Sequence, residues 1–313
     1  MSPPPRVSHL QTYPVKGMRA VSLCQTHLRA LKAFPLDRKW ALLRGEYAGD
    51  GLATSGSASL LAVSYLSTPT SKDMGHHSSK TKFHQMITDP GMASYHVAVS
   101  LDNDNDDDND NDIITIKDAQ NNSVLLTANL STDDGVKEFE DFFAEKGRLP
   151  SATHRPRLVA AHGASFANVG GAPDEHAVVH IVAASTVKAA GEALGDPELD
   201  WRRFRPNVLV DGTAEPWEEL AWCGGRIRMG SVTLEVDEPT IRCPATRVDP
   251  STAVVDASKE RMPDISLKRR FPDLEGDIFG RRTQLSKKGS YLGLYARVVE
   301  GGDVAVGDDV VVL

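Results

Sequence analysis

The residues best suited to chemistry in this sequence are Arg242, Cys243 and Pro244, which stand side by side shortly after an alternating apolar–polar run. That run, residues 226–236, predicts a strand. Pro244 has a fixed φ and no N–H for a central ladder, so we expect Cys243 where the strand gives way to a loop. A neighbouring arginine favours the thiolate, which binds soft metals or attacks electrophiles. The alternative role of an isolated cysteine is that of a small buried hydrophobic side chain.

The elements that must position this cysteine are predicted to be mainly strands. Residues 177–182 read as a strand, residues 185–194 as a short helix, and residues 291–313 as two or three strands joined by Gly-rich turns. Ser185 or Thr186 lies at the helix N-terminus, where unpaired N–H groups favour an anion. Both an ordinary cap and a cofactor contact remain open for these two hydroxyls. A second short helix is expected over 216–222, with proline in its first turn.

The first half of the chain also reads as strands. Residues 6–48 hold three apolar runs, residues 93–101 one more, and residues 113–128 a hairpin. Residues 136–146 predict an amphipathic helix, because their apolar side chains recur at helical spacing. A Pro-, Gly-, Ala- and His-rich stretch over 147–178 is the expected domain junction.

These elements predict a β-rich α+β fold with two domains, residues 1–150 and residues 151–313, although the two barrels could share strands. Neither a GxGxxG nor a GxxxxGK[ST] motif occurs, which argues against a nucleotide-binding α/β fold. The length of 313 residues fits two domains.

Charge and hydropathy narrow the class of protein. Seven of the 43 acidic residues lie in the tract Asp102–Asp112, which leaves 36 against 35 basic residues elsewhere and gives no reason to expect nucleic-acid binding. The tract lacks the central glycine and final glutamate of a calcium loop, so we interpret it as a solvated hairpin tip. No apolar run reaches about 18 residues, so we expect no transmembrane segment. The mean hydropathy is negative, and a soluble protein is expected.

The cysteines indicate the compartment. Cys24, Cys223 and Cys243 are odd in number and widely spaced, which argues against a disulfide framework or a structural zinc site. We therefore expect a reducing, cytoplasmic location, with association with an organelle left open. The adjacent pair His76-His77 is interpreted as solvated within a polar loop rather than as a metal site.

Three ordered segments resemble the MOSC family, named after the C-terminal domain of molybdenum cofactor sulfurase. The stretch Arg242–Pro250 (RCPATRVDP) is similar to the family's cysteine loop, and Phe204–Val210 (FRPNVLV) to its F-R-P-N strand. Tyr13–Gly17 (YPVKG), followed by Leu36–Trp40 (LDRKW), resembles the β-barrel domain that precedes MOSC in the amidoxime-reducing branch. The resemblance spans most of the chain.

The resemblance implies a β-barrel-like N-terminal domain followed by a MOSC β-barrel with short helices. It also implies that Cys243 is the catalytic residue and ligates the metal of a molybdenum cofactor (Mo-molybdopterin) held between the two domains. The residues expected to bind that cofactor are Lys16, Arg38, Ser185, Thr186, Arg205, Asn207, Arg242 and Tyr295. Planar arginine forks suit phosphate and pterin carbonyls, and a thiolate suits a soft metal.

The activity implied is reduction of N-hydroxylated and other N-oxygenated small molecules. Electrons would come from a separate carrier, a cytochrome b5-type or iron–sulfur protein with its reductase, because no ferredoxin-type cysteine pattern is present. The alternatives are a non-catalytic molybdenum cofactor carrier or sulfur-transfer accessory protein, and a metal-free β-barrel binding protein. His154, His162 and His180 are general-acid candidates by residue type alone.

The sequence departs from the family pattern at three places. No glycine precedes Asp37-Arg38 in the run Phe34–Arg38, and no Gln-Arg pair occurs in residues 52–60. The most similar pair in the sequence is Gln85-Met86, which lacks the arginine. Ile241 stands where some relatives have serine before Arg-Cys. These departures leave the first domain's share of the pocket, and hence substrate choice, undefined.

Overall fold

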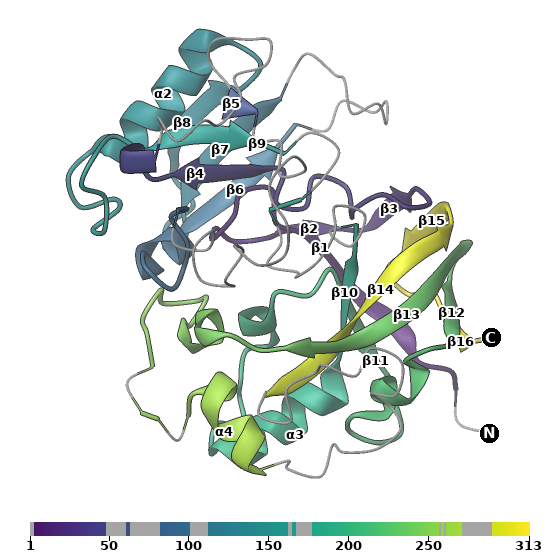
Figure 1. The fold of residues 1–313 in the computed structure, drawn as a ribbon. Coiled ribbons are helices and arrows are strands. Elements are labelled where there is room, and N and C mark those ends of the chain that lie inside the picture. The colour runs from purple at the N-terminus through teal and green to yellow at the C-terminus, as the bar shows by residue number, and fades with distance from the viewer. Residues whose placement is uncertain are drawn as a thin grey trace, which may run out of the picture.

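The structure is a computed structural model, and it describes residues 3–47, 61–62, 82–100, 112–161, 165–166, 177–256, 258–259, 261–270 and 290–313. The interpretations of His76-His77, of His162, of residues 52–60 and of residues 102–111 concern positions outside this set. The predicted β-rich character with few helices is confirmed (Figure 1).

The largest sheet in the described part of the chain has eight strands in the order β16-β12-β13-β14-β10-β11-β1-β2. It curls through the lower half of the molecule in Figure 1. The bounds are β1 (Arg6–Thr12), β2 (Val21–Leu23), β10 (Val179–Ala183), β11 (Val208–Asp211), β12 (Arg226–Met229), β13 (Val232–Ile241), β14 (Tyr291–Glu300) and β16 (Val310–Val312). Its concave side holds a core of buried Val, Leu, Ile and Met side chains, because alternate residues of each strand point inward.

In this sheet, the N-terminal strand β1 lies beside a strand that comes about 200 residues later in the sequence. β1 pairs antiparallel with β11, with Val7 opposite Val210, and β11 runs parallel to β10. In addition, β3 (Gln25–Leu28) pairs with β15 (Gly302–Ala305).

The other two sheets lie in the upper half of Figure 1 with helix α2. One contains β4 (Trp40–Leu43), β9 (Arg157–Ala160) and β5 (Leu61–Ala62), and the other β6 (Tyr95–Val99), β7 (Ile113–Asp118) and β8 (Val124–Asn129). The predicted hairpin and amphipathic helix are confirmed as β7–β8 and α2 (Asp133–Ala144). Thr132 caps α2 by accepting from the Gly135 N–H at 3.1 Å.

The pairing crosses the expected boundary near residue 150 in both directions. Strands β1 to β3 join strands from the second half, while β9 joins β4 in the first half. The division into residues 1–150 and 151–313 stays a prediction.

Two helices pack together beside the large sheet, α3 (Ala184–Leu194) and α4 (Pro263–Arg270). Gly195 ends α3 with φ 69°, directly after the last residue of the helix predicted over 185–194. No helix among the described residues is both long and apolar enough to cross a bilayer.

Short 3-10 helices occupy several connections: η1 (Gly45–Tyr47), η2 (Pro90–Ser94), η4 (Trp201–Phe204), η5 (Glu218–Trp222) and η6 (Pro244–Arg247). Two predictions were wrong in detail here. The expected helix over 216–222 is the 3-10 helix η5. The run 226–236, expected as one strand, contains all of β12 and the start of β13, which form a hairpin with Gly230 in the turn at φ 56°, a conformation that favours glycine.

Candidate functional site

Cys243 lies two residues beyond the end of β13, at the first position before η6, as the proline predicted. Its carbonyl accepts hydrogen bonds from the Thr246 N–H (3.1 Å) and hydroxyl (3.0 Å), which close the turn. The thiol is partly exposed and takes part in no disulfide. The loop therefore presents a free thiol at the end of a strand that is fixed in the large sheet.

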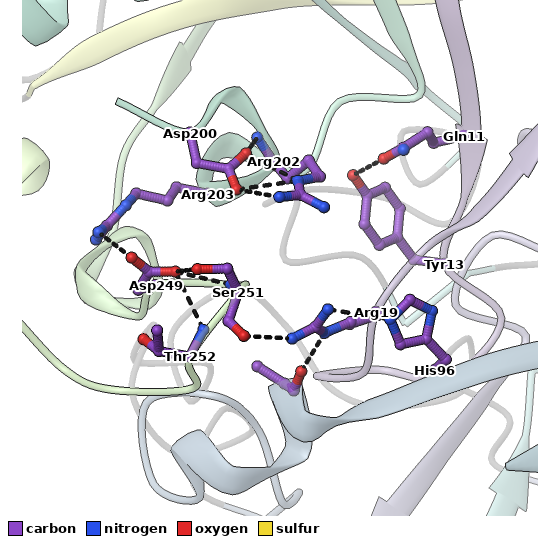
Figure 2. Close-up of polar contacts among 11 residues, drawn as sticks. Gln11, Tyr13, Arg19, His96, Asp200, Arg202, Arg203, Asp249, Ser251 and Thr252 are labelled. Carbon is purple, nitrogen blue, oxygen red and sulfur yellow. Dashed lines mark hydrogen bonds and ion pairs between the residues drawn. The ribbon is translucent and has the colours of Figure 1, made fainter. Parts of the chain in front are cut away.

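Ion pairs to neighbouring elements position the loop that follows Cys243. Arg203 donates to Asp249 (3.1 Å) and to the Arg247 carbonyl (3.2 Å), and Arg247 makes a bidentate pair with Asp264 of α4 (2.9 and 2.6 Å). Figure 2 shows the Arg203–Asp249 contact. The two charged residues of the loop, Arg247 and Asp249, thus serve to position it, because each is paired with an oppositely charged residue outside the loop.

A cavity of about 130 Å³, which we call the cysteine cavity, opens beside Cys243. It brings together seven of the nine residues predicted for the site: Lys16, Arg38, Arg205, Asn207, Arg242, Cys243 and Tyr295. Its lining also includes Asp37, Gln85, Met86, Arg203 and Thr246, which were not assigned to the site from sequence, and His180, which was a general-acid candidate by residue type alone. The cavity draws on both halves of the chain.

Arg38 and Arg205 both reach the cavity from a left-handed backbone, each with φ 53°. This conformation costs about 1 kcal/mol for a residue with a Cβ. The Tyr13 ring lies against both guanidinium groups, with Arg205 Cζ 4.1 Å and Arg38 Cζ 5.0 Å from its centroid. Burial lowers the pKa of Arg38, but the pairing with Asp37 together with the nearby Tyr13 and Tyr295 outweighs it, so the pKa of Arg38 is raised. Burial and Arg38 lower the pKa of Arg205 to about 10.

Arg242 is held by acceptors on three elements. Its Nη2 donates to the Phe204 carbonyl (2.7 Å), and its Nη1 donates to His180 Nε2 (3.2 Å) and the Leu292 carbonyl (3.4 Å). Because arginine only donates, His180 must accept at Nε2 and carry its proton on Nδ1, 3.2 Å from the Arg205 carbonyl. Burial and Arg242 lower the pKa of His180 well below its usual range. His180 is therefore a neutral positioning residue with both nitrogens engaged.

Tyr295 packs against His180, with ring centroids 5.4 Å apart, from the neighbouring strand β14. Burial raises the pKa of its phenol, opposed by Arg242 and Arg38. Asn207 is buried and bridges strands: its Oδ1 accepts from the His180 N–H (3.0 Å) and its Nδ2 donates to the Gln11 carbonyl (3.2 Å). One amide hydrogen of Asn207 then remains for the cavity.

The structure does not bring Ser185 and Thr186 into the cysteine cavity. Ser185 Oγ lies 2.5 Å from Thr213 Oγ1, and Thr186 donates to buried Glu219 (2.8 Å) while accepting from the Trp217 N–H (2.7 Å). Burial raises the pKa of Glu219. These contacts give both hydroxyls a structural task, and their contact with a cofactor stays a prediction.

The other general-acid candidate in the described residues lies elsewhere. His154 Nδ1 is 3.1 Å from the Thr153 hydroxyl on an exposed turn and does not line the cysteine cavity. Sequence reasoning missed His180 as the residue that orients Arg242. The sequence feature that could have identified this role is the position of His180 in the apolar strand predicted over 177–182, because a buried polar side chain needs a hydrogen-bond partner.

The family model that matches this chain is that of the MOSC domain, over residues 161–311. This part of the chain is therefore a MOSC domain, and it contains the Cys243 loop, His180 and the helices α3 and α4. Strands β1 and β2 of the same sheet lie outside the matched residues.

Among curated proteins, the chain is similar to mitochondrial amidoxime reducing component 2 of Macaca fascicularis (30% identity) and of Homo sapiens (29% identity). Each match covers 115 residues, which is 37% of this chain and 31% of the relative. The chain thus spans about a third of the length of the curated relatives it matches.

Two solved structures share a partial likeness. YiiM from Geobacillus stearothermophilus is 19% identical with a TM-score of 0.25, covering 43% of this chain and 53% of that one. The crystal structure of a hypothetical protein is 15% identical with a TM-score of 0.27, covering 43% and 50%. Neither TM-score is high enough to support an argument about this fold.

Proposed function

We propose that this protein binds molybdenum cofactor in the cysteine cavity, with Cys243 as the protein ligand of the metal, and reduces N-hydroxylated and other N-oxygenated small molecules. The observation that carries the proposal is a free thiol beside an excess of cationic side chains that are buried or partly buried. Among the described residues that line the cavity, five are cationic and one, Asp37, is acidic. The MOSC match and the similarity to amidoxime reducing component support it.

The residues present fit the cofactor, which carries a dithiolene and a terminal phosphate. The buried Nη2 of Arg205 and Nε of Arg242 make no hydrogen bond within the described residues, although both arginines border the cavity. An unpaired buried donor is costly, and an anionic ligand removes that cost. Arg38, Arg205 and Arg242 would hold the anionic parts, and Lys16 adds a positive charge at the same wall.

The chain itself contributes binding and orientation. When bound, the cofactor supplies the redox centre, so that two electrons and two protons convert an amidoxime to an amidine and water. His180 fixes Arg242 in place, and the Tyr13 ring fixes Arg38 and Arg205. Because both His180 nitrogens are engaged, we assign the supply of protons to solvent. Electrons come from a separate carrier of the cytochrome b5 or iron–sulfur type.

A second function, that of a molybdenum cofactor carrier or sulfur-transfer accessory protein, uses the same cavity. The partial exposure of the Cys243 thiol favours it, because a thiol that delivers a group must be reached by a partner. The two functions differ in that only the reductase turns over an N-oxygenated substrate.

The test is molybdenum analysis with molybdopterin fluorescence on protein made in a host that synthesises the cofactor. We expect about one molybdenum per chain in the wild type, as one thiolate site predicts, and loss in Cys243→Ser. Cys24→Ser is the matched control, because Cys24 is exposed and does not line the cavity.

Chemically reduced wild type is then given a model amidoxime. Turnover supports the reductase, and bound cofactor without turnover supports the carrier. A well-folded wild type without cofactor contradicts both.

A further inference from the structure

A second, larger cavity of about 250 Å³ lies next to the cysteine cavity, and we call it the arginine cavity. Its lining consists of Gln11, Tyr13, Met18, Arg19, Ala20, Val21, Ser22, Met86, Ala93, His96, Val97, Arg202, Arg205 and Pro250. Met86 and Arg205 border both cavities, and Cys243 borders only the first. Figure 2 shows Arg19, Arg202 and Tyr13 on three sides of one space.

The charged side chains that line this cavity are all positive. Its described lining holds three arginines and no carboxylate. Asp200 neutralises only Arg202, through contacts of 2.6 to 3.0 Å. Arg205 donates to the Met18 carbonyl (2.6 Å) and Met86 sulfur (3.4 Å), which are neutral acceptors.

Arg19 likewise contacts neutral acceptors. It donates to the Ala93 carbonyl (2.5 Å), the Ser251 carbonyl (2.9 Å) and His96 Nε2 (3.0 Å). Because Arg19 can only donate, His96 accepts at Nε2 and carries its proton on Nδ1. These contacts fix the guanidinium between the two halves of the chain, since Ala93 lies in η2 and Ser251 in a turn after η6.

One part of the wall is apolar, from Met18, Ala20, Val21, Ala93 and Val97, and Gln11 and Ser22 add neutral polar groups. A fixed guanidinium presents a planar fork that matches an oxyanion, and an apolar wall favours a hydrocarbon group. The volume suits one small molecule, because pockets for drug-sized ligands begin at about 300 Å³.

We propose that the arginine cavity is a binding site for a small organic anion, a carboxylate or phosphate carried on a single apolar ring or short chain, held by Arg19 and Arg205. The site adjoins the cysteine cavity and shares Arg205 and Met86 with it, but Arg19 lines the arginine cavity alone, so the proposal does not require the function proposed for the cysteine cavity. Its ligand neutralises two guanidinium groups that have no carboxylate contact among the described residues.

The test is isothermal titration calorimetry of the full chain with benzoate and phenyl phosphate as probes, and with benzamide and inorganic phosphate as references. We expect benzoate or phenyl phosphate to bind one per chain. Benzamide lacks the charge and inorganic phosphate lacks the apolar group, so each should bind at least about tenfold more weakly. The better of the two anionic probes tells whether the natural ligand is a carboxylate or a phosphate.

Three variants locate the site. Arg19→Gln should weaken binding at least about tenfold, and Arg228→Gln, an exposed arginine on β12, is the matched control that should not. Ser22→Tyr should also abolish binding, because it fills the cavity from an exposed position and keeps every charge. It decides the question alone if Arg19→Gln fails to fold.

In full-length protein made in a host that does not synthesise the cofactor, Cys243→Ser should leave benzoate affinity unchanged, because Cys243 does not line the arginine cavity. The proposal is overturned by no binding of either anionic probe, by equal binding of benzamide, or by wild-type affinity in Ser22→Tyr. Binding that Cys243→Ser weakens and Arg19→Gln does not would place the anion in the cysteine cavity instead, and would also overturn it.

Discussion

Replacing Asp89 by asparagine should destabilise the fold strongly. Asp89 is fully buried and accepts four hydrogen bonds. They come from His84 Nδ1 (2.9 Å), the Thr88 hydroxyl (2.9 Å), and the N–H (2.9 Å) and hydroxyl (2.7 Å) of Ser151. Burial raises the pKa of Asp89, but these donors outweigh it and bring the pKa from 3.8 to about 2. The carboxylate is therefore stabilised in the folded state.

The magnitude follows from that difference. A pKa of about 2 in place of 3.8 corresponds to about 2.4 kcal/mol. Because the folded-state pKa is the lower one, this stability is fully present above pH 3.8 and is lost as the pH falls towards 2. Asparagine accepts at one oxygen only, so at least one buried donor loses its partner. We expect Asp89→Asn to lower the free energy of unfolding by about 3 kcal/mol at pH 7.

The assay is urea unfolding followed by circular dichroism at pH 7, 5 and 3. The difference between wild type and variant should shrink by about 1 kcal/mol at pH 3, because at that pH the carboxylate is protonated in the unfolded chain, where its pKa is 3.8, but still mostly ionised in the folded protein, where its pKa is about 2. Asp309→Asn is the control, since Asp309 forms an exposed pair with Arg6 and should matter little. A loss below about 1 kcal/mol at pH 7, or a difference that does not change with pH, would refute the reasoning. Gln85, whose carbonyl accepts from the Asp89 N–H at 2.8 Å, lines the cysteine cavity, so the variant should also weaken cofactor retention.

Three further outcomes are expected. Gly293→Ala should lower the melting temperature and reduce the free energy of unfolding by about 2 kcal/mol or more. The reason is that a Cβ at φ 77° would lie 2.6 Å from the Ile181 carbonyl oxygen. A variant as stable as the wild type would contradict this. Thr186→Val should cost about 1–3 kcal/mol in urea unfolding through the loss of Glu219 as its partner, with molybdenum content unchanged; loss of molybdenum from folded protein would instead make Thr186 a cofactor contact. Arg205→Gly should be more stable than Arg205→Ala by about 1 kcal/mol, because only glycine adopts φ 53° without cost; equal stabilities would show that the turn relaxes.

Much of the cysteine cavity could be predicted from sequence because its residues sit in short, locally defined segments. Pro244 fixed the strand end, and the segments around Lys16, Arg38, Arg205 and Arg242 carried the resemblance. The structure brings all four of these cations to one cavity.

What could not be predicted depends on pairing across long distances. The pairing of β1 with β11 could not be predicted from local sequence, since the apolar pattern of a strand shows which face is buried but not which strand is its partner. The same is true of the Arg19 contacts to Ala93 and Ser251, which join segments far apart in sequence. Helix propensity also misled at 216–222, where tertiary contacts give a 3-10 turn.

The place of β1 in the large sheet sets an order of events while the chain is being made. About 200 residues separate Val7 from its partner Val210. At about 5–20 residues per second, β1 waits on the order of 10–40 seconds for β11 to leave the ribosome. The strands from β4 to β9 and helix α2 share a core of their own within residues 15–160, so this half can consolidate during that interval. During that time β2 can pair with one edge of β1, but the other edge stays open. An open strand edge is prone to aggregate, so chaperones that hold the nascent N-terminus should raise the yield of folded protein.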